Sequence, residues 1–589
     1  MKTTTALMLT LGHNSSAIYF DGEKAIGYEE ERLNRVKSSS AYPRLSLDEI
    51  EKNTKIEPGS YVFISHWFDK LNFDEESNKY FDKKHFDELV AKYSLHKVVL
   101  SEGFTHHDAH AWSVVSFLRN KWQSKHNSFV SPGDKFHVIA ADGYGTFQEV
   151  FSVYEFDTTD DTSKLKLIDR FYGYKYSLGL MYQYATSYCG MKENQDEYKF
   201  LGYETYATNL LSPDAICLLR DMVYRKSSDM FSMMIKNNDN RDENWRDPNS
   251  LVNLKSLADT KLYWTKHFDD VIAAVAPGTH GRNLRIVIGH YIQELIEGVV
   301  SRMIDHYSMK HLALAGGIFY NVKLNNKALR KIPGLFSVAP LAGDQGCGVG
   351  MYEAHVSGFE WGDLKWGPRP QFANWQSRVS NEDVKKYGEN IRYYSSADRE
   401  QAIADTVSAL EENQLVNVVK SRMEFGPRAL CSTTTLAIPT SLNVEIINDV
   451  NERDTVMPMA PVMLSGVVDN FFDTSYSARV IGSDRFMILT YDYVSPDLEN
   501  YGGIAHKYPD TNVWSGRPQL IDADDTFMTA VLSNISCKSK ALINTSFNAH
   551  GRPIVYSLDS ILDSFKFELD KALELGHKLP LLYLCDFDG

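Results

Sequence analysis

Apolar and polar residues alternate in short blocks from the start of the chain. The segment ALMLTLGHNSSAIYFDGEKAIGYEEERLNR, residues 6–35, holds three apolar runs separated by a polar turn and an Asp-Gly turn, and it ends in a charged stretch. Short apolar runs bounded by such turns predict three strands followed by the start of a helix. The chain therefore opens like an α/β domain.

Two later segments end an apolar strand in a polar or glycine-rich turn. KFHVIAADGYGT (135–146) predicts a strand and an Asp-Gly turn, and KHLALAGGIFYNVKLNNKAL (310–329) predicts a strand, a Gly-Gly turn and a helix. Between them, apolar residues recur at helical spacing and predict an amphipathic helix with one face in the core. These residues are Leu284, Val287, Ile288, Tyr291, Ile292, Leu295 and Val299.

Two regions lack this regular pattern. Residues 225–250 are polar and weakly periodic, and they predict a surface insertion or a mobile lid. Residues 360–375 are rich in Gly, Pro and Trp. We therefore expect a domain boundary near residues 355–380, with domains 1–360 and 361–589.

Length, composition and charge narrow the class of protein. A chain of 589 residues is too long for one ordinary core, and no window approaches the roughly 18–20 apolar residues of a membrane span. We find no export signal, and the six cysteines form no C-x-x-C pair, which favours reduced, packing thiols and a cytoplasmic location. A net charge of −15 disfavours a broad nucleic-acid surface, so small molecules are the favoured partners.

The sequence THHDAHAWS contains the first candidate for chemistry. His106 and His110 lie four residues apart, so on a helix they share one face and can bind one metal. Histidines at this spacing also serve as ordinary scaffold residues, and carboxylates are needed to decide. Asp142 and Asp344 lie at turns that follow apolar runs, and an N2O2 set suits Fe(II), Zn(II) or Mn(II).

Three glycine-containing turns are candidates for nucleotide binding. Gly316-Gly317, the GDQGCGVG loop at 343–350 and the DGYGT turn allow the backbone to approach a phosphate or adenine, although each is also typical of an ordinary tight turn. None is a Walker A or G-x-G-x-x-G motif. Three such turns in one half of a chain favour the duplicated nucleotide-binding architecture of actin and the sugar kinases.

The second half offers groups that recognise anions. SRMEFGPRAL places Arg422 and Arg428 around a Gly-Pro turn, and INTSFNAHGRPIV joins a strand to a turn that holds Asn544 and Arg552. Arginines and asparagines without a nearby acid indicate recognition of a phosphate or a carbamoyl-like amide. The alternative is that these arginines only brace loops by donating to carbonyls.

Motifs in a fixed order resemble those of the O-carbamoyltransferase family of antibiotic and nodulation-factor biosynthesis. They are LGHNSSAIYFDG, HHDAHA, ADGYGT, ALAGGIFYNVKLN, APLAGDQGCGVG, MEFGPRAL, MPMAPV and NTSFNAHGRPIV. The resemblance implies an α/β first domain with an actin-like ATPase fold, similar to the metal-containing protein that transfers threonylcarbamoyl to tRNA. It implies an α+β second domain similar to the partner synthase that makes the carbamoyl adenylate.

The resemblance also implies a reaction and its cofactors. The second domain would convert carbamoyl phosphate and ATP with Mg(II) to carbamoyl-AMP and pyrophosphate, and the first would transfer the carbamoyl group to an acceptor hydroxyl beside a divalent metal, in this family Fe(II). The acceptor stays open among sugars, polyketides and nucleosides, with a hydroxymethyl-pyrimidine in a nucleotide or in DNA as a specific alternative. A homodimer also stays open.

The resemblance assigns roles to individual positions. His106, His110, Asp142 and Asp344 match the metal ligands, and His13 matches the histidine that serves the acceptor hydroxyl as a general base. The other matching positions are Lys37 and Lys199 near the substrate groups, Gly316, Gly317 and Asn321 in the adenosine-binding turn, and Arg428, Arg517, Asn544 and Arg552 at the carbamoyl-phosphate and ATP site.

Some positions depart from the family pattern. Asn14 and Ser38 stand where the family usually has Asp and His, so the acceptor geometry is expected to differ. Asn451 and Met457 stand where the family has cations at the carbamoyl-phosphate end, which weakens the expected anion binding. A relative that binds the adenylate without synthesising it, and a kinase or hydrolase on the same scaffold, are therefore alternatives.

Overall fold

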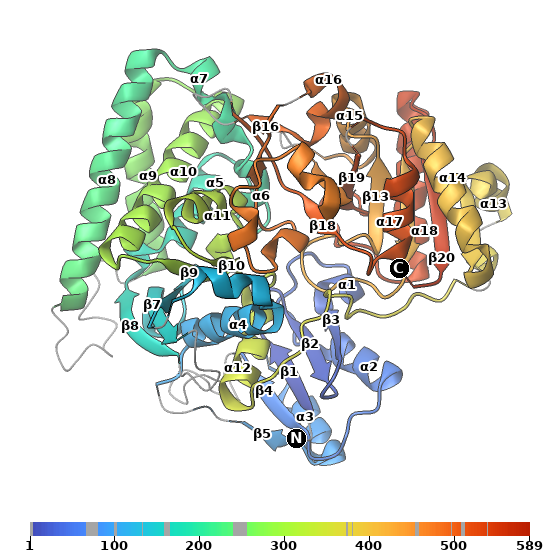
Figure 1. Ribbon diagram of the computed structural model, residues 1–589, viewed down its shortest axis with the longest axis horizontal. Coiled ribbons are helices and arrows are strands. Elements are labelled where there is room, and N and C mark those ends of the chain that lie inside the picture. The colour runs from blue at the N-terminus through green and yellow to red at the C-terminus, as the bar shows by residue number, and fades with distance from the viewer. Residues whose placement is uncertain are drawn as a thin grey trace.

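The structure is a computed structural model. It describes residues 4–65, 81–98, 100, 103–131, 133–157, 165–239, 256–372, 375–379, 381–453, 459–495, 497–507, 513–538 and 540–588. Figure 1 shows the N-terminal sheet at the bottom, a helix-rich lobe on the left and the C-terminal part at the upper right. Within the described ranges no helix is both long enough and apolar enough to cross a membrane.

The first part of the chain forms two five-stranded sheets. The first sheet has the order β3-β2-β1-β4-β5 and contains β1 (Ala6–Thr10), β2 (Ser16–Phe20), β3 (Ala25–Glu29), β4 (Tyr61–Ile64) and β5 (His96–Lys97). The second has the order β8-β7-β6-β9-β10 and contains β6 (Lys135–Ala141), β7 (Glu149–Asp157), β8 (Lys166–Tyr172), β9 (His311–Ala315) and β10 (Phe336–Val338).

The two sheets have the same topology. In each, the first three strands form an antiparallel meander, and the last two strands run parallel to the first strand of that meander. This repeat confirms the predicted duplicated fold of the actin and sugar-kinase class. The three strands predicted at the N-terminus are also confirmed, and the charged stretch after them is the short helix α1 (Glu30–Asn34).

Strand direction brings distant turns to one edge of the second sheet. β6, β9 and β10 are parallel neighbours, so their carboxyl ends lie at the same edge. Asp142 follows β6, the Gly316-Gly317 turn follows β9, and Asp344 begins a short 3-10 helix after β10. Residues that lie about 200 positions apart in the sequence therefore meet in space.

Helices cover the sheets of this half. α4 (His106–Lys121) and α12 (Cys347–His355) pack closely, and a Cβ at Gly350 would lie 1.8 Å from the carbonyl oxygen of Ala109. Besides these two and α8 (Pro213–Asp239), the longer helices are α2 (Arg44–Asn53), α3 (Lys83–Tyr93), α5 (Leu178–Tyr188), α9 (Leu257–Val275), α10 (Gly281–His306) and α11 (Val322–Lys331). The amphipathic helix predicted around residues 284–299 is confirmed as part of α10.

The prediction of an insertion or lid at residues 225–250 is wrong for its first part. α8 (Pro213–Asp239) runs through residues 225–239 and packs against α9 and α10 (Figure 1). Its buried face is formed by Ile216, Leu219, Val223, Met230 and Met234, which recur at helical spacing. Polar residues on the opposite face hid this periodicity, and the rest of the predicted segment, 240–250, lies outside the described residues.

The second part of the chain forms a seven-stranded mixed sheet of order β11-β20-β12-β13-β19-β14-β18. Its strands are β11 (Ile391–Ser395), β12 (Val416–Lys420), β13 (Thr433–Ala437), β14 (Ala460–Leu464), β18 (Gln519–Ile521), β19 (Ala541–Ser546) and β20 (Leu581–Asp586). One face packs against α14 (Arg399–Glu411) and α17 (Thr526–Asn534), and the other packs against α18 (Leu558–Leu575).

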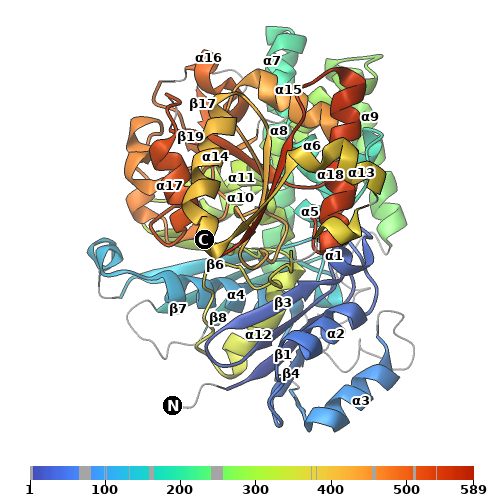
Figure 2. The same ribbon diagram turned by 90° about the vertical axis from the view of Figure 1, so that its right-hand side faces the viewer.

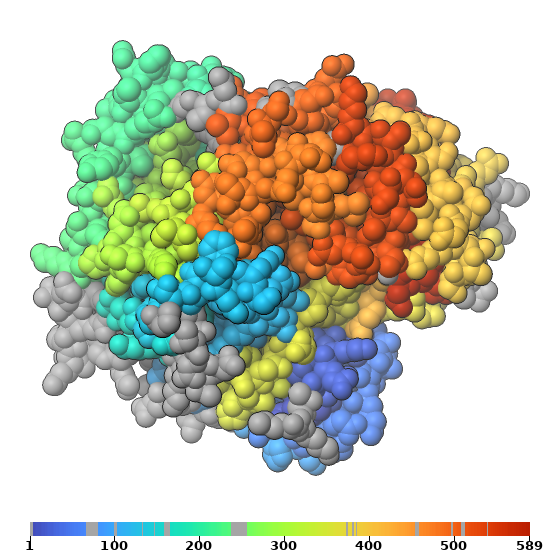
Figure 3. Space-filling model, viewed as in Figure 1, coloured from blue at the N-terminus to red at the C-terminus, as the bar shows by residue number. Residues whose placement is uncertain are grey.

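The two parts meet over a broad surface. Figure 3 shows the orange and red C-terminal residues against the blue and green first part, and Figure 2 shows the third sheet above the first two. The connecting segment belongs to this contact, because Trp361 lies in a core cluster that joins Met8 of the first part to Phe425 of the second. Its indole donates to Ser116 Oγ at 3.0 Å. The division at 360/361 stays a prediction.

Candidate functional site

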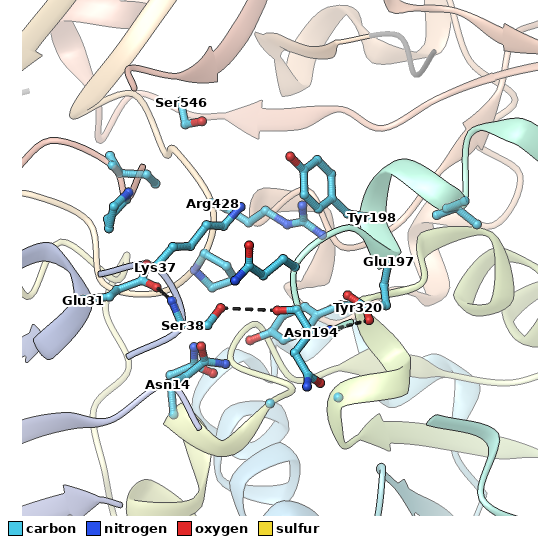
Figure 4. A pocket seen from close by; sticks show the side chains of 18 of the residues that line it. Asn14, Glu31, Lys37, Ser38, Asn194, Glu197, Tyr198, Tyr320, Arg428 and Ser546 are labelled. Atoms are coloured by element: carbon cyan, nitrogen blue, oxygen red, sulfur yellow. Dashed lines mark hydrogen bonds between the residues drawn. The ribbon is translucent and has the colours of Figure 1, made fainter. Parts of the chain in front are cut away.

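A cavity of about 520 Å³ lies between the two parts of the chain. Ten of the residues that the sequence predicted as site residues line it: His13, Lys37, Asp142, Gly317, Asn321, Asp344, Arg428, Arg517, Asn544 and Arg552. Figure 4 shows Ser546 on one side, Asn14 and Ser38 on the other, and Arg428 and Tyr198 between them. Both parts of the chain therefore contribute to one chamber.

The four predicted metal ligands converge at one end of this cavity. His106 Nε2 lies 3.0 Å from His110 Nε2, 3.2 Å from Asp142 Oδ2 and 3.3 Å from Asp344 Oδ1. His110 Nε2 lies 3.4 and 3.6 Å from the same two carboxylate oxygens. A metal with bonds of about 2.0–2.2 Å places neighbouring donors about 2.9–3.6 Å apart, so these residues fit a divalent metal.

Electrostatics at this cluster favour a cation. Burial alone would lower the pKa of His106, but the nearby Cys347 and Asp344 raise it well above its usual range. Burial alone would raise the pKa of Asp344, but His106 and His110 hold it well below its usual range. Two half-buried carboxylates thus stabilise positive charge at the point where the four donors meet.

The two histidines of this cluster, His106 and His110, lie in the first turns of a capped helix. Thr105 Oγ1 accepts a hydrogen bond from the Asp108 backbone, and the Asp108 carboxylate accepts one from the Thr105 backbone, which fixes the first turn of α4. His107 and Asp108 point away from the cluster: His107 Nδ1 lies 2.9 Å from Ser152 Oγ, and Asp108 pairs with Arg170.

The predicted adenosine turn has room only for glycine. Gly316 has φ +105°, and a Cβ there would lie 1.9 Å from the carbonyl oxygen of Ala141. A Cβ at Gly317 would lie 2.7 Å from Asp142 Oδ1. The Asn321 side chain caps α11, because its Oδ1 accepts a hydrogen bond from Leu324 N at 3.0 Å. This oxygen is therefore already used within the protein.

Cations without carboxylate partners line the other end of the cavity. Within the described part of the chain, neither the Arg428 nor the Arg517 side chain makes a hydrogen bond or an ion pair, and Arg428 lies over the Tyr320 ring at 5.9 Å. Burial and the neighbouring Arg428 charge hold the pKa of Arg517 well below its usual range. Half-buried guanidinium groups without a protein partner suit an anionic ligand.

Two predicted lysines stand near these arginines. Burial lowers the pKa of Lys37, whose ammonium lies 5.1 Å from the centre of the Tyr198 ring. Lys199 does not line the cavity. Its ammonium pairs with Asp196 at 2.8 Å and donates to His550 Nε2 at 3.1 Å, which links the first part of the chain to a cavity residue of the second.

Two other predicted groups serve the loops rather than an open site. The Asn544 amide is saturated, because it donates to the Ala429 carbonyl at 3.0 Å and to Gln519 and accepts from Thr434. Arg422 donates to the carbonyl of Gly367 at 2.9 Å and to that of Trp366. For Arg422 the loop-bracing alternative therefore describes the geometry.

Residues 451–457, where two cations of the family pattern are missing, still contain one cation, Arg453. Arg453 lines the cavity and donates to Thr545 Oγ1 at 2.8 Å and to the carbonyls of Ser546 and Asn548 at 2.6 and 2.9 Å. Asn451 is buried, and Met457 lies outside the described residues. One of the cations that the family pattern predicts in this segment, the Arg453 guanidinium, thus lies in the cavity wall.

Sequence reasoning missed several residues of the site. Glu197 lines the cavity on the short helix α6 (Glu197–Phe200), and burial raises its pKa to about 7. Tyr198, Tyr320 and His550 line it as well. Cys347, which we expected to be a packing residue, lies with its Sγ 3.7 Å from His110 Nε2. Its position directly after GDQG, at the start of a helix, was the available signal.

Comparisons with known proteins identify the family of this chain. Residues 7–352 match the family model for the carbamoyltransferase N-terminus, and residues 407–579 match that for the carbamoyltransferase C-terminus. An uncharacterized protein of Methanocaldococcus jannaschii is 26% identical, with 96% of this chain and 98% of that protein covered. The nodulation protein NolNO of Sinorhizobium fredii is 25% identical, with 94% of this chain and 77% of that protein covered.

Among solved structures, full-length HypF in its phosphate- and nucleotide-bound form aligns with a TM-score of 0.28 at 13% identity, covering 61% of this chain and 57% of that one. At such a score, the fold assignment rests on the repeated sheet topology. The two family models, in contrast, match most of the sequence, and this chain therefore belongs to the carbamoyltransferase family.

Proposed function

We propose that the protein is an ATP-dependent O-carbamoyltransferase that works through carbamoyl-AMP. The observation that carries the proposal is the single cavity in which the carboxylates of Asp142 and Asp344 face the same space as the unpaired guanidinium groups of Arg428 and Arg517. Unpaired arginines suit phosphates, and a metal site in the same cavity suits transfer from an adenylate.

In the first half-reaction, one water molecule hydrolyses carbamoyl phosphate to carbamate and inorganic phosphate. The carbamate oxygen then attacks the α-phosphate of ATP and releases pyrophosphate. Arg428, Arg517 and Arg453 would bind the phosphate groups. Lys37, which lines the same cavity, would stabilise phosphate charge that the arginines leave uncompensated. Desolvated cations that are in place before the substrate binds stabilise such charge most effectively.

In the second half-reaction, the acceptor hydroxyl attacks the carbamoyl carbon and AMP leaves. His13 lines the cavity on the turn after β1, where its imidazole would take the hydroxyl proton. His106, His110, Asp142 and Asp344 would hold the metal, for which we propose Fe(II); when bound it supplies Lewis-acid polarisation and neutralises charge on the leaving AMP. The six free cysteines support a reducing, cytoplasmic compartment.

The test separates the half-reactions. The protein is incubated with ATP, Mg(II) and labelled pyrophosphate, with and without carbamoyl phosphate, and nucleotides are analysed by mass spectrometry. We expect exchange of label into ATP that depends on carbamoyl phosphate, and AMP and a product heavier by one carbamoyl group when a hydroxyl acceptor is supplied. ADP as the product would favour a kinase or hydrolase, and binding of ATP without exchange would favour a relative that does not synthesise the adenylate.

A further inference from the structure

The first residue of α12 lies against the proposed metal site. Asp344 begins the 3-10 helix that leads into α12, and Cys347 is the first residue of α12 itself. The close packing of α12 on α4 at Gly350 holds this turn beside the helix that carries the two histidines. The Cys347 side chain is fully buried, so its sulfur is directed into the protein and away from solvent.

The sulfur lies at a distance that fits coordination. Cys347 Sγ is 3.7 Å from His110 Nε2, and one ligand atom from each of His106, His110, Asp344 and Cys347 lies within 4.8 Å of the others. A metal with bonds of about 2.3 Å to sulfur and about 2.1 Å to nitrogen separates the two donors by about 3.6 Å at a tetrahedral angle. The observed distance requires almost no movement of either side chain.

We propose that Cys347 is a thiolate ligand of this metal and that the site therefore takes a thiophilic transition metal, in the class of Fe(II), Zn(II) or Co(II), in preference to Mg(II) or Mn(II). Soft thiolate ligands select such metals, whereas sites made only of carboxylates, carbonyls and water suit the harder cations. The inference rests on the metal site of the proposed function, and it adds a sulfur donor to His106, His110 and Asp344.

Cobalt substitution tests the assignment without an activity measurement. The purified full-length protein is stripped with a chelator and reloaded with Co(II) under anaerobic conditions. We expect a thiolate-to-cobalt charge-transfer band in the near ultraviolet at about one Co(II) per chain. Cys347→Ser should lose this band and bind Co(II) at least about tenfold more weakly, since removal of a ligand should cost no less than removal of an outer partner. Cys189→Ser, a buried cysteine in another core cluster, should keep the band.

X-ray absorption on the zinc-loaded wild-type protein keeps the test decisive if Cys347→Ser fails to fold. A sulfur scatterer at about 2.3 Å supports the assignment. Bound metal without a charge-transfer band and without sulfur scattering overturns the thiolate ligand but leaves the four-ligand site standing. A band that survives in folded Cys347→Ser also overturns it. Wild-type protein that binds no Co(II) or Zn(II) overturns the metal site itself, and the inference with it.

Discussion

Arg428 and Arg517 line the same cavity, and desolvation together with the charge of Arg428 lowers the pKa of Arg517. Neither guanidinium has an acidic partner among the described residues, so the folded protein holds two half-buried like charges in one cavity. Such an arrangement destabilises the fold unless an anion occupies the site. The two side chains are therefore expected to serve ligand binding at the expense of stability.

Replacing either arginine by methionine should separate function from stability. We expect Arg428→Met and Arg517→Met to reduce carbamoyl-phosphate-dependent pyrophosphate exchange by about 10- to 100-fold, the loss expected for one charged hydrogen bond. The melting temperature without ligand should stay the same or rise. Arg422→Met is the matched control from the same motif: it removes hydrogen bonds to Gly367 and Trp366, so the melting temperature should fall. Equal destabilisation by all three substitutions would contradict this account.

Substitutions can distinguish a proposed metal ligand, Asp344, from Asp108, which lies between the two histidines in sequence but outside the cluster. Asp344→Asn should lower the metal content from about one ion per chain to near zero, because the carboxylate lies within reach of both histidines. Asp108→Asn should retain the metal and lose stability, since Asp108 pairs with Arg170 and caps α4. Elemental analysis and thermal denaturation give the two readouts. Retention of full metal content by Asp344→Asn would contradict the assignment.

The meeting of these side chains could largely be predicted from the sequence, because strand direction determines where the turns that carry them lie. Asp142, Gly316 and Asp344 each follow a strand, and their three strands are parallel neighbours in one sheet. Helical spacing put His106 and His110 on one face, and the two carboxylates were needed to make them candidate ligands. The contribution of Cys347 could not be predicted, because it depends on how closely α12 approaches α4, which is decided by packing at Gly350.

Which arginines and asparagines face the cavity without a protein partner could be predicted less completely from the sequence. Its guanidinium groups come from separate loops of a mixed sheet, and sequence alone does not show which of them find partners. Arg422 donates to backbone carbonyls, and Asn544 donates to Gln519 and Ala429. Arg428, in contrast, has no partner among the described residues. Helix α8 was missed because its polar face diluted the periodicity of its buried residues.

His13 should act only in the second half-reaction. We expect His13→Ala to keep pyrophosphate exchange at the wild-type rate and to lower carbamoylation of an accepted hydroxyl by about 10²- to 10⁴-fold, the usual contribution of a general base. Carbamoyl-AMP should then be detectable by mass spectrometry. His577→Ala is a suitable control, since His577 pairs with Asp449 away from the cavity. Loss of exchange in His13→Ala would place this histidine in adenylate formation instead.

Glu568 should make stability depend on pH. Burial raises the pKa of this carboxyl to about 7, although Asn417 donates to it at 2.6 Å. Between its ordinary pKa of about 4.3 and this value, the folded state holds the proton and the unfolded state does not, so stability falls as pH rises through the window.

Glu568→Gln should lack that loss. Its stability relative to wild type should increase from pH 5 to pH 8 by at most about 3 kcal/mol, measured by urea denaturation at each pH. Glu574→Gln, a largely exposed partner of Lys571 on the same helix, should show no such trend. A pH-independent difference between Glu568→Gln and wild type would mean that the carboxyl titrates near its ordinary pKa in the fold.

Substitution of two glycines with positive φ separates the cost of a strained backbone from the cost of a steric clash. Gly316 has φ +105°, and a Cβ there would lie 1.9 Å from the Ala141 carbonyl oxygen, whereas Gly358 has φ +81° and nothing within 4 Å of a Cβ. Gly358→Ala should cost only the strain of the left-handed backbone, about 1–3 kcal/mol. Gly316→Ala must also push β9 from β6, which displaces the turn beside Asp142. It should therefore lose more stability, and any folded fraction should bind metal more weakly. Equal melting temperatures for the two variants would show that the turn has room to relax.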